Sequence, residues 1–495
     1  MELDLSNRNI SGKDVLLVVA PPVFTRMPPL GAAYLVTYLK QHGRSVELLD
    51  LSTLLFNQSA DPLTNLWNPE SSNFLFQSEI ADRIYNGFKA ELDGFVEWVL
   101  NADIHVIAFS VNQVSIYLAN KLAENIKARD KGRIIIFGGP ATYFKTPREL
   151  ITPGFVDYFV IGEGESVFLS LLTRLKKGGT IGFEPGILPG KDVGIRVAIP
   201  SKPVANLDLL PFPTYEEFDL PAYNKGFDYK PLPLLLSRGC INMCSYCIDH
   251  IMWPKYRVRS AGHAFREIEY HCRVNKVRAF EWNDLLCNGN LGVLESLCDL
   301  IIASGLQFSW VSYAVIRPDM TERLFVKMKK AGCHTLIYGM EHVSPGVLER
   351  MNKRYSPAQV HEVLRKTHGS GICTNVNVIV GFPGETEADL KMLTEFLTQN
   401  KAYISEVTNI SGFVLFPDSF IGHNGARYGI NWDRASDPML FKDAQGLDRH
   451  RRIERVAYFS RMIEDMGLRS NIINRPKLNP LVKEASGDQS CSDGN

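Results

Sequence analysis

The chain has 495 residues, 45% hydrophobic and 22% charged, an ordinary globular composition that is long enough for two or more domains. Lys plus Arg and Asp plus Glu number 54 each, which excludes a strong global field attracting nucleic acid or an acidic membrane surface. None of the nine cysteines precedes residue 240, and outside one short segment they are scattered singly, as in a reduced protein.

The first residues show no basic segment followed by an apolar run, so we expect no signal peptide. No apolar stretch approaches the ~20 residues that a membrane helix needs. We therefore expect a cytoplasmic protein with no membrane span and no nucleic acid partner.

Residues 1–180 are predicted to form a first domain, because strand and helix signals alternate along them. The continuous apolar run 14–20 is typical of a buried parallel strand. Further strands are expected at 45–50, 104–110, 133–138 and 157–161, with helices at 30–40, at 117–127 and after 165. Repeated βα units predict an α/β fold, a doubly wound, Rossmann-like parallel sheet with helices on both faces.

Small residues and prolines gather where these strands end, the edge at which such sheets bind ligands. Glycines there would let the backbone approach a large flat ligand. The order of these segments resembles the cobalamin-binding domain found upstream of many radical SAM enzymes, over most of residues 14–175. The resemblance implies a cobalamin site that includes Pro21, Ser110, Gly138, Gly139, Gly162 and Gly164.

One motif of that family is absent from the chain. The Asp-x-His-x-x-Gly loop, whose histidine ligates cobalt, does not occur, so cobalamin would be bound without a protein histidine ligand. The alternative is that the sheet is a scaffold that binds no corrinoid or serves another ligand.

Residues 181–232 are rich in Pro and Gly and also carry many aromatic residues. This composition predicts an inter-domain linker that wraps and packs, and not a flexible tether.

Three closely spaced cysteines, Cys240, Cys244 and Cys247, follow this segment. Three thiolates hold three irons of a [4Fe–4S] cube, and without a fourth cysteine at matching spacing one iron stays open to a ligand. The spacing, with the aromatic Tyr246 just before the last cysteine, resembles the radical SAM superfamily. A structural zinc site is the alternative, in which His250 would supply the fourth ligand.

The alternation of strands and helices restarts at residue 233 and predicts a second domain, 233–420. Strands are expected at 234–237, 279–282, 308–315, 335–338, 375–380 and 406–416. Helices are expected at 262–274, 291–303, 321–330 and 387–397 and after residues 344 and 356. Six βα units indicate a partial (β/α)6 barrel that is open on one side, with its active residues at the carboxyl ends of the strands.

Several residues at these strand ends match radical SAM motifs. The resemblance implies that they contact S-adenosylmethionine (SAM): polar residues near its amino group, a carboxylate for its ribose or ammonium, and backbone for its adenine. These are Asn283 and Asp284 after the second strand, Glu341 at the fourth, and Asn377 and Gly381 in Asn375-Val-Asn-Val-Ile-Val-Gly-Phe-Pro-Gly-Glu-Thr386. Two departures are Asn283, where related enzymes often have Asp, and His342, where Ser is usual.

Other residues near the motifs carry weaker signals. Arg257 and Arg259 stand where the family has an arginine near the cluster or the SAM carboxylate, or they form a solvated basic turn. Cys287 and Cys373 either face the cavity or are core thiols, and Trp253, Trp310 and Tyr313 either line a substrate cavity or pack.

Residues 421–495 are predicted to be a helical C-terminal region, with its clearest amphipathic helix at 449–466, expected at the open side of the barrel. Its polar end, 483–495, is expected to be disordered.

The resemblance implies that the reduced cluster cleaves SAM to methionine and a 5′-deoxyadenosyl radical, which removes hydrogen from an unactivated carbon. It further implies a cobalamin-dependent C-methyltransferase acting on a small-molecule or natural-product substrate, with an external electron donor such as flavodoxin or ferredoxin.

Three alternatives stay open. A radical SAM enzyme of the same architecture could catalyse cyclisation, ring contraction or carbon–carbon coupling. A tRNA methylthiotransferase would need three N-terminal cysteines, which this chain does not have. A non-catalytic corrinoid- or metal-binding module would bind a cofactor without cleaving SAM.

Overall fold

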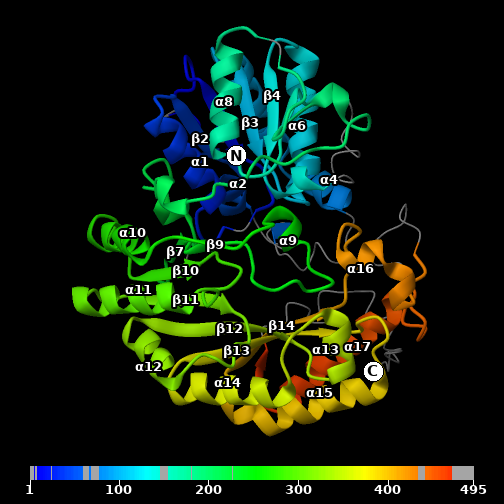
Figure 1. The fold of residues 1–495 in the computed structure, drawn as a ribbon. Helices are drawn as coiled ribbons and strands as arrows, with labels where there is room; N and C mark the ends of the chain where they lie inside the picture. The colour runs from blue at the N-terminus through cyan, green and yellow to red at the C-terminus, as the bar shows by residue number, and fades with distance from the viewer. Residues whose placement is uncertain are drawn as a thin grey trace, which may run out of the picture. The chain divides into compact units, whose positions relative to one another are not determined.

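The computed structural model describes residues 5, 8–23, 25–59, 66–67, 77–144, 154–179, 181–225, 227–432 and 441–470 (Figure 1). The chain forms two compact units. The first comprises Met1–Pro233 with Arg273–Ala279, and the second comprises Leu234–Cys272 with Phe280–Asn495. The segment that we expected to be a linker therefore belongs to the first unit.

The first unit contains a six-stranded sheet in the order β2-β1-β3-β4-β5-β6. Its first five strands run parallel, as predicted, and each lies within two residues of its expected position. They are β1 (Val15–Val19), β2 (Val46–Asp50), β3 (Val106–Ser110), β4 (Ile134–Gly138) and β5 (Tyr158–Val160).

Helices cover both faces of this sheet, since every residue of β1 is buried. Helix α1 (Leu30–Gln41) packs on α8 (Gly164–Lys176), and α6 (Ser115–Arg129) packs on α4 (Gln77–Gly87) and α5 (Lys89–Asn101). Helix α2 (Leu51–Gln58) follows β2 directly. Because the strand order reverses between β1 and β3, the ligand-binding crevice of such a sheet is expected at their carboxyl ends.

The sixth strand was not predicted. Strand β6 (Ile187–Pro189) lies in the expected linker and pairs antiparallel with β5 at the edge of the sheet. A proline is tolerated on an edge strand because its missing N–H does not interrupt an internal ladder. The many prolines around this three-residue strand hid it in the sequence.

A seven-stranded sheet has the order β15-β14-β13-β12-β11-β10-β7, and all of its residues except Leu232, Pro233 and Ala279 belong to the second unit. Six of its strands alternate with helices as expected of a partial barrel, and β11 to β15 pair parallel. The strands are β7 (Leu232–Leu234), β10 (Ala279–Trp282), β11 (Ser309–Ala314), β12 (Cys333–Glu341), β13 (Cys373–Val380), β14 (Glu406–Gly412) and β15 (Arg469–Ser470).

The helices of this unit follow the strands in chain order and lie close to their predicted positions (Figure 1). They are α10 (Ala261–Arg273), α11 (Leu291–Ser304), α12 (Glu322–Lys330), α13 (Pro345–Met351), α14 (Pro357–Gly369) and α15 (Glu387–Asn400). Ser356 and Thr386 begin the last two with capping boxes, which satisfy the first backbone N–H groups of each helix.

The expected single strand 234–237 is wrong. Strand β7 ends at Leu234, and Ser237 and Arg238 form a separate strand, β8, paired antiparallel with β9 (Arg257–Val258). The interruption has a physical cause: the backbone N–H groups of Leu236 and Ser237 donate to the Asp284 carboxylate and not to a neighbouring strand.

The barrel strands have one face against helices and one that is partly open. On the helix side, Tyr338 and Val376 are fully buried, and the Tyr338 hydroxyl lies 2.8 Å from the hydroxyl of Thr367 on α14. On the opposite face, Asn375 of β13 lies in register with Glu406 of β14 and donates to its carboxylate at 3.3 Å. Asn375 and Glu406 therefore form a polar pair on the face opposite the helices.

The C-terminal region forms α17 (Arg449–Asp465), which packs against β13, β14 and β15 at one edge of the sheet. The expected disordered tail, 483–495, lies outside the described residues.

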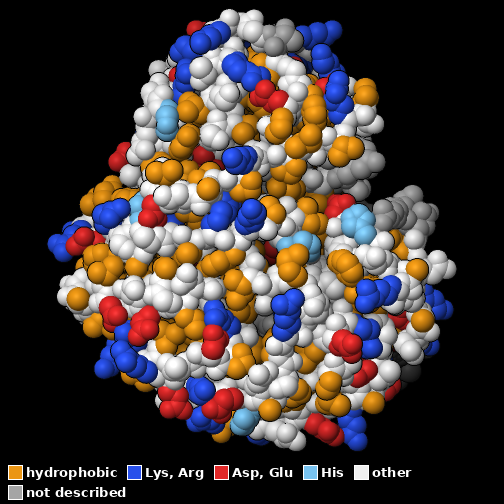
Figure 2. Space-filling view, in the orientation of Figure 1, with side chains coloured by type: hydrophobic (Ala, Val, Ile, Leu, Met, Phe, Trp, Pro, Cys, Tyr) orange, Lys and Arg blue, Asp and Glu red, His pale blue; other side chains and the backbone are white. Residues whose placement is uncertain are grey.

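In the parts of the chain that the structure describes, no helix is both long and apolar enough to span a bilayer. On the face shown in Figure 2, acidic and basic side chains are interspersed over the helices of the barrel unit.

Candidate active site

The three predicted cluster ligands lie on one loop between β8 and the short helix α9 (Asp249–Met252). Cys240 and Cys247 are half-buried, and Cys244 is 9% exposed. The loop begins at Gly239, whose φ is 91° and whose added Cβ would lie 2.5 Å from the carbonyl oxygen of Lys255. Only glycine fits this turn without moving the backbone.

The loop supplies donors to two of the sulfurs. The N–H of Asn242 donates to Cys240 Sγ, and that of Asp249 to Cys247 Sγ, each at 3.4 Å. Burial nevertheless raises the pKa of Cys240 and of Cys247, and the nearby Asp249 carboxylate raises the pKa of Cys247 further. With raised pKa values, these cysteines would become thiolates only beside a positive centre such as iron. Three soft thiolate ligands that also accept N–H···S bonds fit an iron–sulfur cluster.

Among the described side chains, no three His, Cys, Asp or Glu groups converge closely enough to hold one metal ion. This does not test a cube, which takes each thiolate on a separate iron. His250, the expected fourth ligand of a zinc site, lies on α9 and its Nδ1 is buried with no hydrogen-bond partner.

Asp284 holds the start of the cysteine loop. Its carboxylate is buried and accepts from the backbone N–H of Leu236 at 2.8 Å and from the N–H and hydroxyl of Ser237. Burial raises the pKa of Asp284 to about 7, against the lowering effect of these donors. The structure thus shows Asp284 bracing the loop, and its predicted contact with SAM stays a prediction.

Arg259 braces the same segment from the other side. Its guanidinium is 1% exposed, donates to the carbonyl of Leu235 at 2.6 Å and forms an ion pair with the buried Glu267 of α10. The alternative of a solvated basic turn is therefore wrong for Arg259. Arg257 is half-buried, and its Nε donates to the carbonyl of Lys255 at 3.3 Å.

Glu341 ends β12 with a φ of 64°, a left-handed conformation that costs a non-glycine residue free energy. Its carboxylate lies 3.8 Å from Lys353 Nζ, and burial raises its pKa while Lys353 and Tyr246 lower it. Lys353 Nζ also donates to the carbonyl of Gly339 at 2.9 Å and lies 5.8 Å from the centre of the Tyr246 ring. Two of the predicted residues, Glu341 and Tyr246, thus both contact the buried ammonium group of Lys353.

Lys353 itself was not predicted. Burial alone would lower its pKa, but Tyr355, Tyr246, Cys244 and Glu341 together raise it well above its usual range. Its signal in the sequence was only a basic pair, Lys353-Arg354, shortly after a helix. The cation lies beside the cysteine loop, because Lys353 Nζ contacts the Tyr246 ring and the neighbouring Asn352 donates to the carbonyl of Met243.

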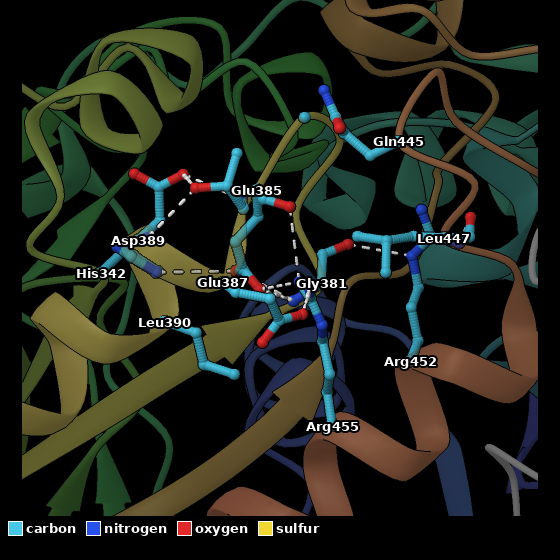
Figure 3. Close-up of polar contacts among 12 residues, drawn as sticks. His342, Gly381, Glu385, Glu387, Asp389, Leu390, Gln445, Leu447, Arg452 and Arg455 are labelled. Carbon is cyan, nitrogen blue, oxygen red and sulfur yellow. Dashed lines mark hydrogen bonds and ion pairs between the residues drawn. The ribbon is translucent and has the colours of Figure 1, made fainter.

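The Gly381 loop closes on itself (Figure 3). Gly381 has a φ of 72°, and its N–H donates to both carboxylate oxygens of Glu385 at 3.0 Å. Burial raises the pKa of Glu385 to about 7, while Gly381 and Arg455 lower it. His342 Nε2 lies 3.6 Å from Glu385, and burial lowers the pKa of this imidazole to about 4.

Two predicted amides differ in their surroundings. Asn377 Oδ1, on β13, is buried without a hydrogen-bond partner, which suits a group that accepts from a ligand. Asn283 is exposed just after β10, and its N–H donates to the carbonyl of Leu234 at 2.7 Å. Both lie near carboxyl ends of barrel strands, as do Glu341 and Gly381.

In the first unit, the predicted Pro21, Ser110 and Gly138 lie at the carboxyl ends of neighbouring strands, with Ser110 in register with both Val19 and Gly138. Asn112 links two of these ends, because its Nδ2 donates to the carbonyl of Pro22 at 3.2 Å and its Oδ1 accepts from Ser115 at the start of α6. Gly164 begins α8.

At two of the predicted positions, the requirement for glycine has a cause other than a ligand. An added Cβ on Gly139, with φ 110°, would lie 2.6 Å from the carbonyl oxygen of Val111. One on Gly162, with φ 99°, would lie 2.5 Å from the Ser201 hydroxyl and 2.7 Å from its backbone nitrogen. Here the close approach is between parts of the chain itself, and the role of these glycines toward cobalamin stays a prediction.

The Gly162→Ala variant is expected to lower the stability of the first unit. Gly194→Ala is the matched control, because Gly194 has a φ of 78° but nothing within 4 Å of an added Cβ. Overpacking against Ser201 should make Gly162→Ala the less stable of the two by about 1–3 kcal/mol in denaturant unfolding. Equal losses would show that backbone strain alone sets the glycine requirement.

The remaining candidates divide between core and surface. Cys287 is 1% exposed and burial raises its pKa to about 12, which confirms a core thiol. Trp310 is fully buried, and its ring stacks on that of Trp282 with 4.3 Å between the ring centres. Cys373 begins β13, at the end of the strand away from the cysteine loop. Tyr313 is 45% exposed, and Arg238 lies 5.7 Å from the centre of the Trp253 ring.

Residues 234–397 match the family model of the Radical SAM superfamily. The second unit therefore contains a radical SAM domain, which indicates an enzyme and implies a [4Fe–4S] cluster and SAM as cofactors.

Among curated proteins, the chain is 25% identical to an uncharacterized methyltransferase of Pyrococcus horikoshii, PH0819, over 77% of each chain. It is 22% identical to an anaerobic magnesium-protoporphyrin IX monomethyl ester cyclase of Synechocystis, over 53% of each. Among solved structures, its fold is similar to the radical SAM methyltransferase TsrM of Kitasatospora setae. The TM-score is 0.63 and the identity 18%, over 89% of this chain and 81% of TsrM.

Proposed function

We propose that the protein is a cobalamin-dependent radical SAM methyltransferase acting on an unactivated carbon of a small molecule or natural product. The observation that carries the proposal is the three-cysteine loop, whose Tyr246 ring contacts Lys353 of the buried pair Glu341 and Lys353, within a radical SAM domain. An external donor such as flavodoxin or ferredoxin would supply the electron.

In this proposal Cys240, Cys244 and Cys247 hold three irons of the cluster, and Asp284 and Arg259 fix the strand that leads into their loop. Glu341 would bond the SAM ribose or ammonium, and the unpartnered Asn377 Oδ1 would accept from SAM. The backbone of the run Asn375–Thr386 would pair with adenine. When bound, the cluster supplies the one-electron cleavage of SAM, and cobalamin supplies a methyl group. The chain supplies orientation and excludes water.

Cobalamin is proposed at the carboxyl edge of the first unit's sheet, around Pro21, Ser110 and Gly138. The strand order 2-1-3-4-5 supports this, because sheets of this kind bind ligands where the order reverses, here at the ends of β1 and β3. The solved TsrM structure is described as holding cobalamin and a [4Fe–4S] cluster, which supports the same pairing of cofactors here. Asn112 would fix the two strand ends that flank the corrinoid.

The likeness to an anaerobic cyclase favours a second candidate, a radical SAM enzyme that does not methylate. The test is anaerobic reconstitution with iron, sulfide and hydroxocobalamin, then reaction with dithionite, SAM labelled in its methyl group and metabolite extract. We expect a bound-corrinoid absorption band, 5′-deoxyadenosine, and label in a product.

Each failure has its own meaning. No corrinoid band at saturating cobalamin would refute the assignment of the first unit. Formation of 5′-deoxyadenosine together with an altered but unlabelled product would establish the cyclase-type alternative. Bound cofactor without any SAM cleavage would leave only a binding module.

A further inference from the structure

The loop from Gly381 to Glu385, between β13 and α15, is held from outside as well as from within. Within the loop, the Gly381 N–H donates to the Glu385 carboxylate and closes a hydrogen-bonded ring. The Gly381 carbonyl is not part of this ring and can accept from another group. That carbonyl accepts from Arg452 Nε of α17 at 2.9 Å. The other end of the loop is held too, because the Gly384 N–H donates to Asp443 at 3.1 Å.

Arg452 is 1% exposed and has several partners in this region. Besides Gly381, its guanidinium donates to the carbonyls of Leu447 at 2.7 Å and Phe441 at 3.3 Å, and lies 3.5 Å from Asp443. It also lies 3.9 Å from the centre of the Phe441 ring. A buried guanidinium with this many acceptors is held in one position, so the carbonyl of Gly381 is held with it.

Arg455, three residues further along α17, binds the other side of the ring (Figure 3). It donates to the Glu385 carboxylate at 2.5 Å and forms a second ion pair with Glu387. The Glu385 side chain is fully buried, whereas that of Arg455 is 12% exposed. One turn of the C-terminal helix thus places one arginine on each end of the same five-residue loop.

The buried face of α17 also contains apolar residues. These residues, Val456, Phe459 and Ile463, provide an apolar face toward the sheet. The fit at the loop is close: a Cβ on Gly381 would lie 2.8 Å from Arg452 Cγ. Arg452 therefore fixes the direction of the Gly381 carbonyl. Arg455 fixes the Glu385 carboxylate, which accepts from the Gly381 N–H.

We infer that Arg452 and Arg455 are positioning residues for SAM, which act by holding the Gly381–Glu385 loop in the conformation that receives the adenine. This inference rests on the proposed function, in which the backbone of the run Asn375–Thr386, which contains this loop, pairs with adenine. The C-terminal helix would thus set the affinity for SAM without touching it.

The test uses the full chain, reconstituted with its cluster, and the variant Arg455→Met, which changes the less buried arginine. Losing a hydrogen bond to a charged group is expected to raise the KM for SAM about tenfold to a hundredfold. At saturating SAM, the rate of 5′-deoxyadenosine formation and the iron content should stay within about threefold of the wild type. Arg455→Lys should recover part of the lost affinity, since it keeps the charge.

Arg461→Met is the matched control, because Arg461 is exposed on the same helix. An unchanged KM for SAM in Arg455→Met would overturn the inference, as would an equal rise in the control. Lower iron content or thermal midpoint with an unchanged KM would assign Arg455 a structural role only, which also overturns it. A wild-type protein that neither binds nor cleaves SAM would instead refute the proposed function.

Discussion

Cys244→Ala is expected to abolish cluster assembly and 5′-deoxyadenosine formation. Cys244 is the middle cysteine of the loop and, at 9% exposure, the most buried of the three. Two thiolates would leave two irons of the cube without protein ligands, so the cluster would not persist. Iron and sulfide content, the absorption of the reconstituted protein, and 5′-deoxyadenosine yield with dithionite measure the effect.

Cys373→Ala is the control for this experiment. Cys373 is partly exposed but lies at the start of β13, away from the cysteine loop, so its loss should leave iron content and SAM cleavage unchanged. Retention of a cluster and of SAM cleavage in Cys244→Ala would refute the ligand assignment. Zinc bound stoichiometrically in the anaerobic wild type would refute the cluster itself.

The elements that the sequence predicted well are those whose signal is local. The apolar run at β1 and the capping boxes of Ser356 and Thr386 are consecutive patterns, and their elements lie within a few residues of the expected positions. Strand β6 and the break between β7 and β8 were missed. The first is a short edge strand among prolines, and the second depends on Asp284, which is 47 residues away in the chain.

The site shows the same division. The cysteines, Glu341 and the Gly381 loop stand in recognisable local motifs. Lys353, Arg452 and Arg455 do not, because each gains its role from partners in other elements: Lys353 from Glu341 and Tyr246, and the arginines from the Gly381 loop. A lone lysine or arginine in a sequence is usually a solvated surface residue, and only burial distinguishes these three.

Lys353→Met is expected to lower kcat/KM for SAM cleavage by about a hundredfold or more. The Lys353 side chain is 5% exposed, and its loss would leave the Glu341 carboxylate buried without its cation. Without this cation the carboxylate that is proposed to orient SAM would shift, and a misplacement of about 1 Å costs about a hundredfold in rate. Rates of 5′-deoxyadenosine formation over a range of SAM concentrations measure this, with Lys330→Met, an exposed lysine of α12, as control.

The double variant Lys353→Met/Glu341→Gln separates structure from chemistry. It leaves no unpaired charge in the site, so thermal midpoint and iron content should return toward wild-type values. If the pair serves only the fold, SAM cleavage should return as well. If Glu341 and Lys353 act on SAM, cleavage should stay low although the protein is stable and loaded with iron, because the groups that orient the cosubstrate are gone. We expect the second result, and full recovery of activity would refute a role of this pair in the reaction.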